Sequence, residues 1–249
     1  RRAGAAAMAT KNLTINVGTS FNTIAQRQSR GGSLVYSSNV LSGSVLVVSI
    51  GSTTAFGTSE FTAEQLTDTL GTVYSLIPGS CYSEKGSIIY GCLYWGVSPG
   101  AGANTVSLPF GISSSSSMLF EFTNVQTVFD LGLIAKLTSN AGGATITSGA
   151  ITIPASSMLW GYTWPGSSGA ALTAGAGFAS GLAYSAGGNG GQFTSLQEYE
   201  VGAAAGSSTA TWGVTSNASN IWSTILLSFR PTVSGTAPIG GGYRKKGPF

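Results

Sequence analysis

The amino-acid sequence predicts an all-β protein, an antiparallel β-sandwich or jelly roll with extended N- and C-terminal arms. Three observations lead to this fold class. Apolar residues make up 42% of the 249 residues, which is enough for one sizeable core, while charged residues make up only 8%. Short segments of alternating apolar and polar residues recur between turns rich in glycine, serine and asparagine. Apolar residues at the spacing of an amphipathic helix are almost absent, and the best candidate for a helix, 61–66, is too short to organise a domain.

The alternating segments give the expected strands and divide the chain into three parts. The expected strands cover residues 12–17, 33–37, 44–50, 72–77, 80–84, 88–96, 104–110, 117–123, 127–136, 144–153, 157–163, 176–184, 193–201, 208–214 and 221–230. Residues 1–32 are polar and poor in aromatics, so we expect an N-terminal arm there. Residues 33–230 form the expected β-sandwich domain, and 231–249 form a proline- and glycine-rich basic arm.

The most specific local prediction is a β-hairpin that contains both cysteines. Gly86-Ser87 separates two short strand-like segments and suits a type II′ turn, which favours glycine at its first position. In that register, residues whose numbers sum to 173 face each other, and Cys81 and Cys92 form such a pair. Opposed residues on neighbouring strands lie within disulfide reach. A disulfide and two buried free thiols are both consistent with the sequence.

The formal net charge of +3 hides an uneven distribution. Six basic residues remain between the two chain ends, against all eight acids, so the body is slightly acidic. The other five basic residues lie at the ends and are Arg1, Arg2, Arg244, Lys245 and Lys246. They either keep the ends solvated or contact other subunits or a nucleic acid. A role in nucleic-acid binding is thus confined to the basic tips.

Composition argues against an enzyme and against a cofactor. Without histidine, the chain has no Ser-His-Asp or Cys-His machinery and no imidazole-ligated metal, and two cysteines cannot form a four-thiolate site. Glu198 and Glu200 lie two apart in a strand-like segment, and we interpret them as part of a solvent-facing strand surface rather than a glycosidase pair. Asp68 precedes a glycine turn, where its carboxylate is expected to accept backbone N–H groups.

Three aromatic residues alternate near the end of an expected strand. Trp160, Tyr162 and Trp164 would share one face of that strand. They could form a platform that stacks on a glycan, or they could fill the core or a subunit interface. Pro165 follows directly and ends the strand, which favours the core or interface interpretation.

Five segments also occur in an order that resembles a known β-sandwich module. They are residues 45–50, 66–74, 93–96 with 102–108, 118–122, and 222–230. The module is found in bacterial extracellular proteins and bacteriophage structural proteins, and its hallmarks are a "TDS-GN-Y" turn, a "GANTV" strand entry, an "EYSG" strand and a closing tryptophan strand. Thr69, Leu70 and the Phe-Thr-Asn at 122–124 depart from that pattern. The resemblance implies a fold and a virion or extracellular setting, and it brings no catalytic residues.

Together these observations predict a non-catalytic virion protein, in a capsid shell, a decoration or a fibre. Few charges oppose association with further copies, and arms can exchange backbone hydrogen bonds with neighbouring subunits. The expected partners are other copies of the chain and other virion proteins. The alternative is a secreted carbohydrate-binding or adhesive module that uses the aromatics at 160–164. No membrane span is expected, because the most apolar run, 44–50, is far shorter than about 20 residues.

Overall fold

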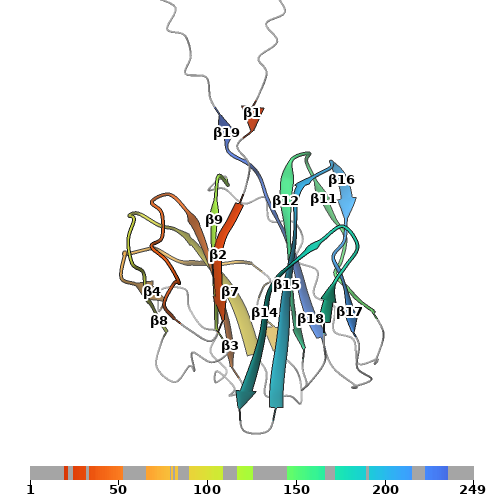
Figure 1. Ribbon diagram of the computed structural model, residues 1–249, viewed down its shortest axis with the longest axis horizontal. Helices are drawn as coiled ribbons and strands as arrows, with labels where there is room; N and C mark the ends of the chain where they lie inside the picture. Colours follow the sequence, from red (N-terminus) through yellow and green to blue (C-terminus); the bar gives the residue numbers. More distant parts are fainter. Residues whose placement is uncertain are drawn as a thin grey trace, which may run out of the picture.

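The computed structural model describes residues 20–21, 25–31, 34–52, 66–78, 80, 82–83, 90–108, 117–125, 145–165, 172–188, 191–214 and 222–234. Within these ranges the protein is all-β, with strands paired antiparallel in several sheets and no helix (Figure 1). The all-β prediction is therefore confirmed for the described part of the chain. No helix in those ranges is long and apolar enough to cross a membrane.

The larger of the two main sheets has six strands. Their order is β2-β9-β3-β7-β5, and β6 follows β5 along the same edge of β7. The bounds are β2 (Ala25–Gly31), β9 (Met118–Thr123), β3 (Val45–Ser52), β7 (Tyr90–Val97), β5 (Ser75–Leu76) and β6 (Tyr82–Ser83). β3 is buried on both faces, which explains its continuous apolar sequence.

The second main sheet has four strands in the order β14-β15-β12-β18. The bounds are β14 (Ala179–Gly188), β15 (Gly191–Ala203), β12 (Ser157–Pro165) and β18 (Trp222–Phe229). The β12–β15 ladder is interrupted near its end, because Ser157 pairs with Ala203 but Met158 pairs with Val201. Gly202 is the extra residue, and its φ of 75° is one that glycine adopts without strain.

Four small sheets complete the described structure. A three-stranded sheet has the order β10-β17-β13, with β10 (Thr145–Thr147), β17 (Thr211–Val214) and β13 (Leu172–Ala174). The two-stranded sheets pair β11 (Ile151–Ile153) with β16 (Gly206–Ser208), β4 (Thr67–Asp68) with β8 (Val106–Ser107), and β1 (Ser20–Phe21) with β19 (Val233–Ser234).

Three hydrophobic clusters connect these sheets. The first joins the two main sheets, and Phe120 of β9 packs edge-on against Trp160 of β12 with ring centroids 5.1 Å apart. The second lies between the four-stranded sheet and the β10-β17-β13 sheet and contains Trp212. The third lies on the other face of the six-stranded sheet, where residues from 34–40, from the segment at 66–74 and from β8 contribute. Each main sheet is therefore covered on both faces.

Several expected strands are confirmed with small shifts in their ends. The segments at 44–50, 88–96, 117–123, 157–163, 193–201, 208–214 and 221–230 correspond to β3, β7, β9, β12, β15, β17 and β18. The expected strand at 144–153 is wrong as one element, because β10 and β11 are separated by 148–150 and pair with different partners. The expected strands at 12–17 and 127–136 lie outside the described residues, as does the segment 61–66 apart from Leu66.

The last part of the expected N-terminal arm contains a strand. Residues 25–31 form β2, which pairs with β9 at the edge of the six-stranded sheet. β2 contains no large apolar residue, so its sequence carries no alternating signal. Its described contacts include the backbone ladder with β9 and the ion pair between Arg27 and Glu121. At the other end, β19 pairs with β1, while residues 1–19 and 235–249 lie outside the described residues.

The predicted hairpin register is confirmed where it is described. Tyr82 pairs with Gly91 and Ser83 pairs with Tyr90, so both pairs sum to 173. Cys92, the next residue of β7, is disulfide-bonded, and the free-thiol alternative therefore does not apply to it. Cys81, the other cysteine of the chain, and the turn at 86–87 lie outside the described residues.

Candidate functional site

The described part of the chain contains four acidic side chains, and three of them are held by specific donors. Glu121 and Glu198 have no exposed surface, and Asp68 is half-buried. A buried carboxylate is costly unless donors or a cation compensate for the lost water. The surroundings of these three carboxylates show how the described part of the chain compensates its buried acidic groups.

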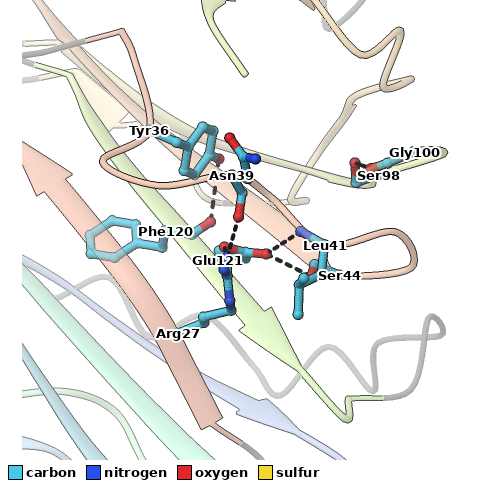
Figure 2. Close-up of polar contacts among 9 residues, drawn as sticks. All are labelled: Arg27, Tyr36, Asn39, Leu41, Ser44, Ser98, Gly100, Phe120 and Glu121. Atoms are coloured by element: carbon cyan, nitrogen blue, oxygen red, sulfur yellow. Dashed lines mark hydrogen bonds and ion pairs between the residues drawn. The ribbon is translucent and has the colours of Figure 1, made fainter. Parts of the chain in front are cut away.

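Glu121 is the centre of a polar cluster that joins β9, β2 and the turn at 39–44 (Figure 2). Its Oε2 lies 2.6 Å from Nη1 of Arg27. Its Oε1 accepts hydrogen bonds from the backbone N–H of Leu41 and the hydroxyl of Ser44, both at 2.8 Å. Nη1 of Arg27 also donates to the carbonyl of Asn39. Both carboxylate oxygens are thus engaged by protein donors.

Arg27 reaches this position because β2 carries a bulge. Gln26 pairs with Phe122 and Gln28 pairs with Glu121, so Arg27 is the extra residue on β2. Its side chain is 30% exposed, whereas the carboxylate of Glu121 is fully buried. The guanidinium therefore closes the outer side of a buried anion. The arrangement fixes β2 on β9.

The sequence contains one signal for this site. Glu121 is a single acid inside an otherwise apolar strand, Met118–Thr123, whose other residues are mostly buried. A charge at such a position requires a partner. Nothing local identifies Arg27 as that partner, because it comes from a polar segment 94 residues away.

Asp68 organises the turn between β4 and β5, and the predicted Asx-type turn is confirmed. Its Oδ1 accepts the backbone N–H of Leu70 at 3.1 Å and of Thr72 at 2.9 Å. Its Oδ2 accepts the hydroxyl of Tyr74 and the Nδ2 amide of Asn104, both at 2.8 Å. One carboxylate therefore joins the segment at 66–74 to the segment at 102–108.

These bonds control the ionisation of the Asp68 cluster. Burial acts to raise the pKa of Asp68, but the hydrogen bonds from Asn104, Thr72 and Tyr74 outweigh it, so the pKa lies below its usual value of 3.8. Burial raises the pKa of Tyr74 well above its usual value, and the nearby hydroxyl of Tyr36 and the Asp68 carboxylate add to this shift. Asp68 is thus an anion and Tyr74 a neutral donor at neutral pH.

Glu198 lies between the four-stranded sheet and the β10-β17-β13 sheet. Its Oε2 accepts the backbone N–H of Gly175 at 2.8 Å, while Oε1 is buried without a hydrogen-bond partner. Gly161 of β12 lies opposite Glu198 of β15. Because Gly161 has no side chain, neighbouring side chains occupy the space that its Cβ would take. A methyl group at Gly161 would lie 2.9 Å from the Trp212 ring and 3.1 Å from Cγ of Glu198. The interpretation of Glu198 as part of a solvent-facing surface is therefore wrong, because β13 and β17 cover it.

The environment of Glu198 favours its neutral form. Burial raises its pKa to about 7, and the backbone amides of Gly175 and Thr211 act in the opposite direction. The strands around it, β12, β13, β14, β17 and β18, contain no charged residue. Glu198 therefore changes its protonation near neutral pH inside an uncharged layer.

No family model, curated protein or solved structure matches the chain.

Trp160 and Tyr162 do not form part of the glycan platform considered from the sequence. Trp160 and Tyr162 have no exposed surface and stack on each other with ring centroids 5.6 Å apart. Both belong to the cluster between the two main sheets. Trp164 belongs to β12, and its side chain lies outside the described part of the structure. Two of the three candidate residues are thus core residues.

The remaining candidate contact residues cannot be placed. Arg1, Arg2, Arg244, Lys245 and Lys246 all lie outside the described residues. Within the described ranges, no group of three or more acidic or cysteine side chains could hold a metal ion. The polar groups that the structure does describe, around Asp68, Glu121 and Glu198, hold loops and strands together.

Proposed function

We propose that this protein is a non-catalytic structural subunit that assembles with copies of itself, in a virion shell, decoration or fibre. The observation that carries the proposal is the pairing of β1 with β19. Ser20 lies opposite Ser234 and Phe21 opposite Val233, so β1 and β19 lie side by side at one end of the body (Figure 1). Both segments can then reach the same neighbouring subunit.

We further propose that the two main sheets form a β-sandwich. Its support is the shared cluster in which Phe122 of β9 stacks on Phe229 of β18 with ring centroids 4.6 Å apart. The outer faces of both sheets are covered by smaller sheets and loops. Such a body is rigid, and association through its surface and arms would not require it to rearrange.

The polar chemistry of the body supports a structural role as well. Asp68, Glu121 and Glu198 are each engaged in joining separate segments of the chain. Few charges oppose contact between copies, since only 8% of the residues are charged. The sequence resemblance to phage structural modules adds the virion setting and other virion proteins as partners.

The proposal is tested by the mass of the full chain in solution, measured by light scattering after size exclusion. We expect oligomers or particles for the full chain, and a large loss of them for a chain reduced to residues 20–234. The matched control changes Arg244, Lys245 and Lys246 to alanine at full length. If that variant assembles normally, the arms act through more than charge. A full chain that stays monomeric at every concentration would overturn the proposal.

A further inference from the structure

The β10-β17-β13 sheet, which we call the cover sheet, lies on one face of the four-stranded sheet. Trp212 of β17 shares a hydrophobic cluster with Leu159, Leu196 and Leu226 of the larger sheet. The cover sheet is small, because its strands have only three or four residues each. A sheet of this size is not stable without a packed face, so the cover sheet depends on its contact with the four-stranded sheet.

Glu198 of β15 is the polar link across this contact. Its Oε2 accepts the backbone N–H of Gly175, the residue that follows β13, at 2.8 Å. The backbone amide of Thr211, the first residue of β17, also favours the carboxylate. Oε1 is buried without a hydrogen-bond partner. An ionised Glu198 therefore has two amides and no cation to offset its loss of water, whereas the neutral acid loses much less.

Three other buried polar atoms of this layer have no hydrogen-bond partner, and they are Nε1 of Trp212, Oγ1 of Thr224 and Oγ of Ser228. Thr224 and Ser228 lie two residues on either side of Leu226, so they share its face of β18. A buried polar group without a partner costs free energy, which is recovered when water reaches the group. Water that enters the layer therefore gains hydrogen bonds with these atoms as well as with Oε1 of Glu198.

The described strands around Glu198 offer no cation to hold it as an anion. β10, β11, β12, β13, β14, β17, β18 and the turn at 175–178 contain no charged residue. Their titratable groups are two tyrosines. Tyr162 of β12 belongs to the cluster between the two main sheets, on the other face. Tyr184 of β14 lies four residues beyond Ser180, which pairs with Glu198.

The titratable residues at the edge of this layer do not supply a cation either. Glu200 lies two residues along β15 and is half-buried, so its negative charge disfavours a second anion nearby. Tyr199 lies between the two acids and packs against the cluster between the main sheets. Arg230 follows β18, four residues beyond Leu226. Burial therefore dominates, and it raises the pKa of Glu198 to about 7.

We propose that the cover sheet is a pH-controlled element, closed on the four-stranded sheet while Glu198 is neutral and shifted towards an open form when Glu198 ionises. Opening admits water to the carboxylate and uncovers Leu159, Leu196 and Leu226. The four-stranded sheet keeps its place, because its other face packs in a separate cluster with the six-stranded sheet. This element goes beyond the proposed assembly role and does not depend on it.

Hydrogen exchange of the backbone amides, measured by mass spectrometry on the full chain from pH 5 to pH 9, tests the opening. The pKa of Glu198 is about 7 in the closed form and has its usual value of 4.5 in the open form, so protons stabilise the closed form. The opening equilibrium should therefore rise about tenfold between pH 6 and pH 8 and level off above about pH 8. After correction for the intrinsic pH dependence of exchange, peptides that contain β10, β13 and β17 should lose protection by this factor. Peptides that contain β3 and β9 should not.

The variant Glu198→Gln should remove this pH dependence, and the matched control Glu200→Gln should keep it, because Glu198 is intact there. The wild-type series tests the proposal without any substitution. Protection of the cover sheet that does not change with pH, or that still falls between pH 8 and pH 9, would overturn the proposal. An equal loss in β3 and β9 would overturn it as well, because it would show unfolding of the whole body. A folded Glu198→Gln variant that keeps the wild-type pH dependence would exclude Glu198 as the controlling group.

Discussion

Replacing Glu198 by glutamine should remove a pH dependence that the wild-type protein carries. Burial raises the pKa of Glu198 from 4.5 to about 7, so the folded state binds a proton that the unfolded state releases. The wild-type protein is therefore most stable below pH 4.5 with respect to this group, and it loses that stability as the pH rises towards 7. Glutamine has a similar shape, retains an oxygen for the Gly175 amide, and does not ionise.

The magnitude follows from the size of the shift. A pKa of about 7 against 4.5 corresponds to about 3 kcal/mol between pH 4.5 and pH 8. For a chain of this size that amounts to about 6–12 °C in Tm. Among the described residues, the other perturbed groups fall outside this interval, because the pKa of Asp68 lies below 3.8 and those of Tyr36 and Tyr74 lie well above 10. Glu198→Gln should then be more stable than wild type at pH 8 and similar to it at pH 5.

The assay is urea unfolding at several pH values from 5 to 8, followed by tryptophan fluorescence. The matched control is Glu200→Gln, which removes a half-buried carboxylate two residues away on the same strand. It should keep the wild-type loss of stability, since Glu198 is intact. The reasoning is refuted if Glu198→Gln loses as much stability between pH 5 and pH 8 as the wild-type protein does.

Three further changes test other parts of the structure, each by the free energy of unfolding in urea. Arg27→Ala should lower the free energy of unfolding by about 3 kcal/mol, because it leaves Glu121 buried without its cation. A much smaller loss when Arg27→Ala is made in the Glu121→Gln variant would show that the two residues are coupled. Tyr74→Phe should cost about 1 kcal/mol, because Asp68 loses one of its donors; an unchanged value would exclude that bond from the stability of the turn. Gly161→Ala should cost about 1–3 kcal/mol through its close approach to Trp212, and wild-type stability would contradict the packing described there.

The sequence was informative where one strand or turn carries its own signal. The buried strands β3, β7, β9, β12 and β18 were found from their apolar residues, because those residues face cores on one or both sides. The register of β6 on β7 followed from a two-residue turn, and the role of Asp68 followed from the glycine turn after it. In each case the determining residues are neighbours in the sequence.

The sequence failed where a distant segment decides the environment. Glu198 alternates with Tyr199 as on a solvent-facing strand, but β13 and β17 cover it, and neither is adjacent in sequence. Arg27 lies in a polar segment that resembles an arm, and only the bulge on β2 and the buried Glu121 make it part of the body. The missing information is which layers stack on which sheet, and local periodicity does not contain it.

The β1–β19 pair also determines how the body would respond to mechanical load. Ser20 and Ser234 form the outermost pair, and the chain approaches and leaves through them. Tension applied through both ends would therefore open this short ladder one hydrogen bond after another, instead of shearing all its bonds at once. The next contact on the C-terminal side is the hydrogen bond from the backbone N–H of Thr232 to the carbonyl of Asn124, and the bridge between Val125 and Pro231 follows it. Under tension the β1–β19 pair would therefore separate before the two main sheets carry any force.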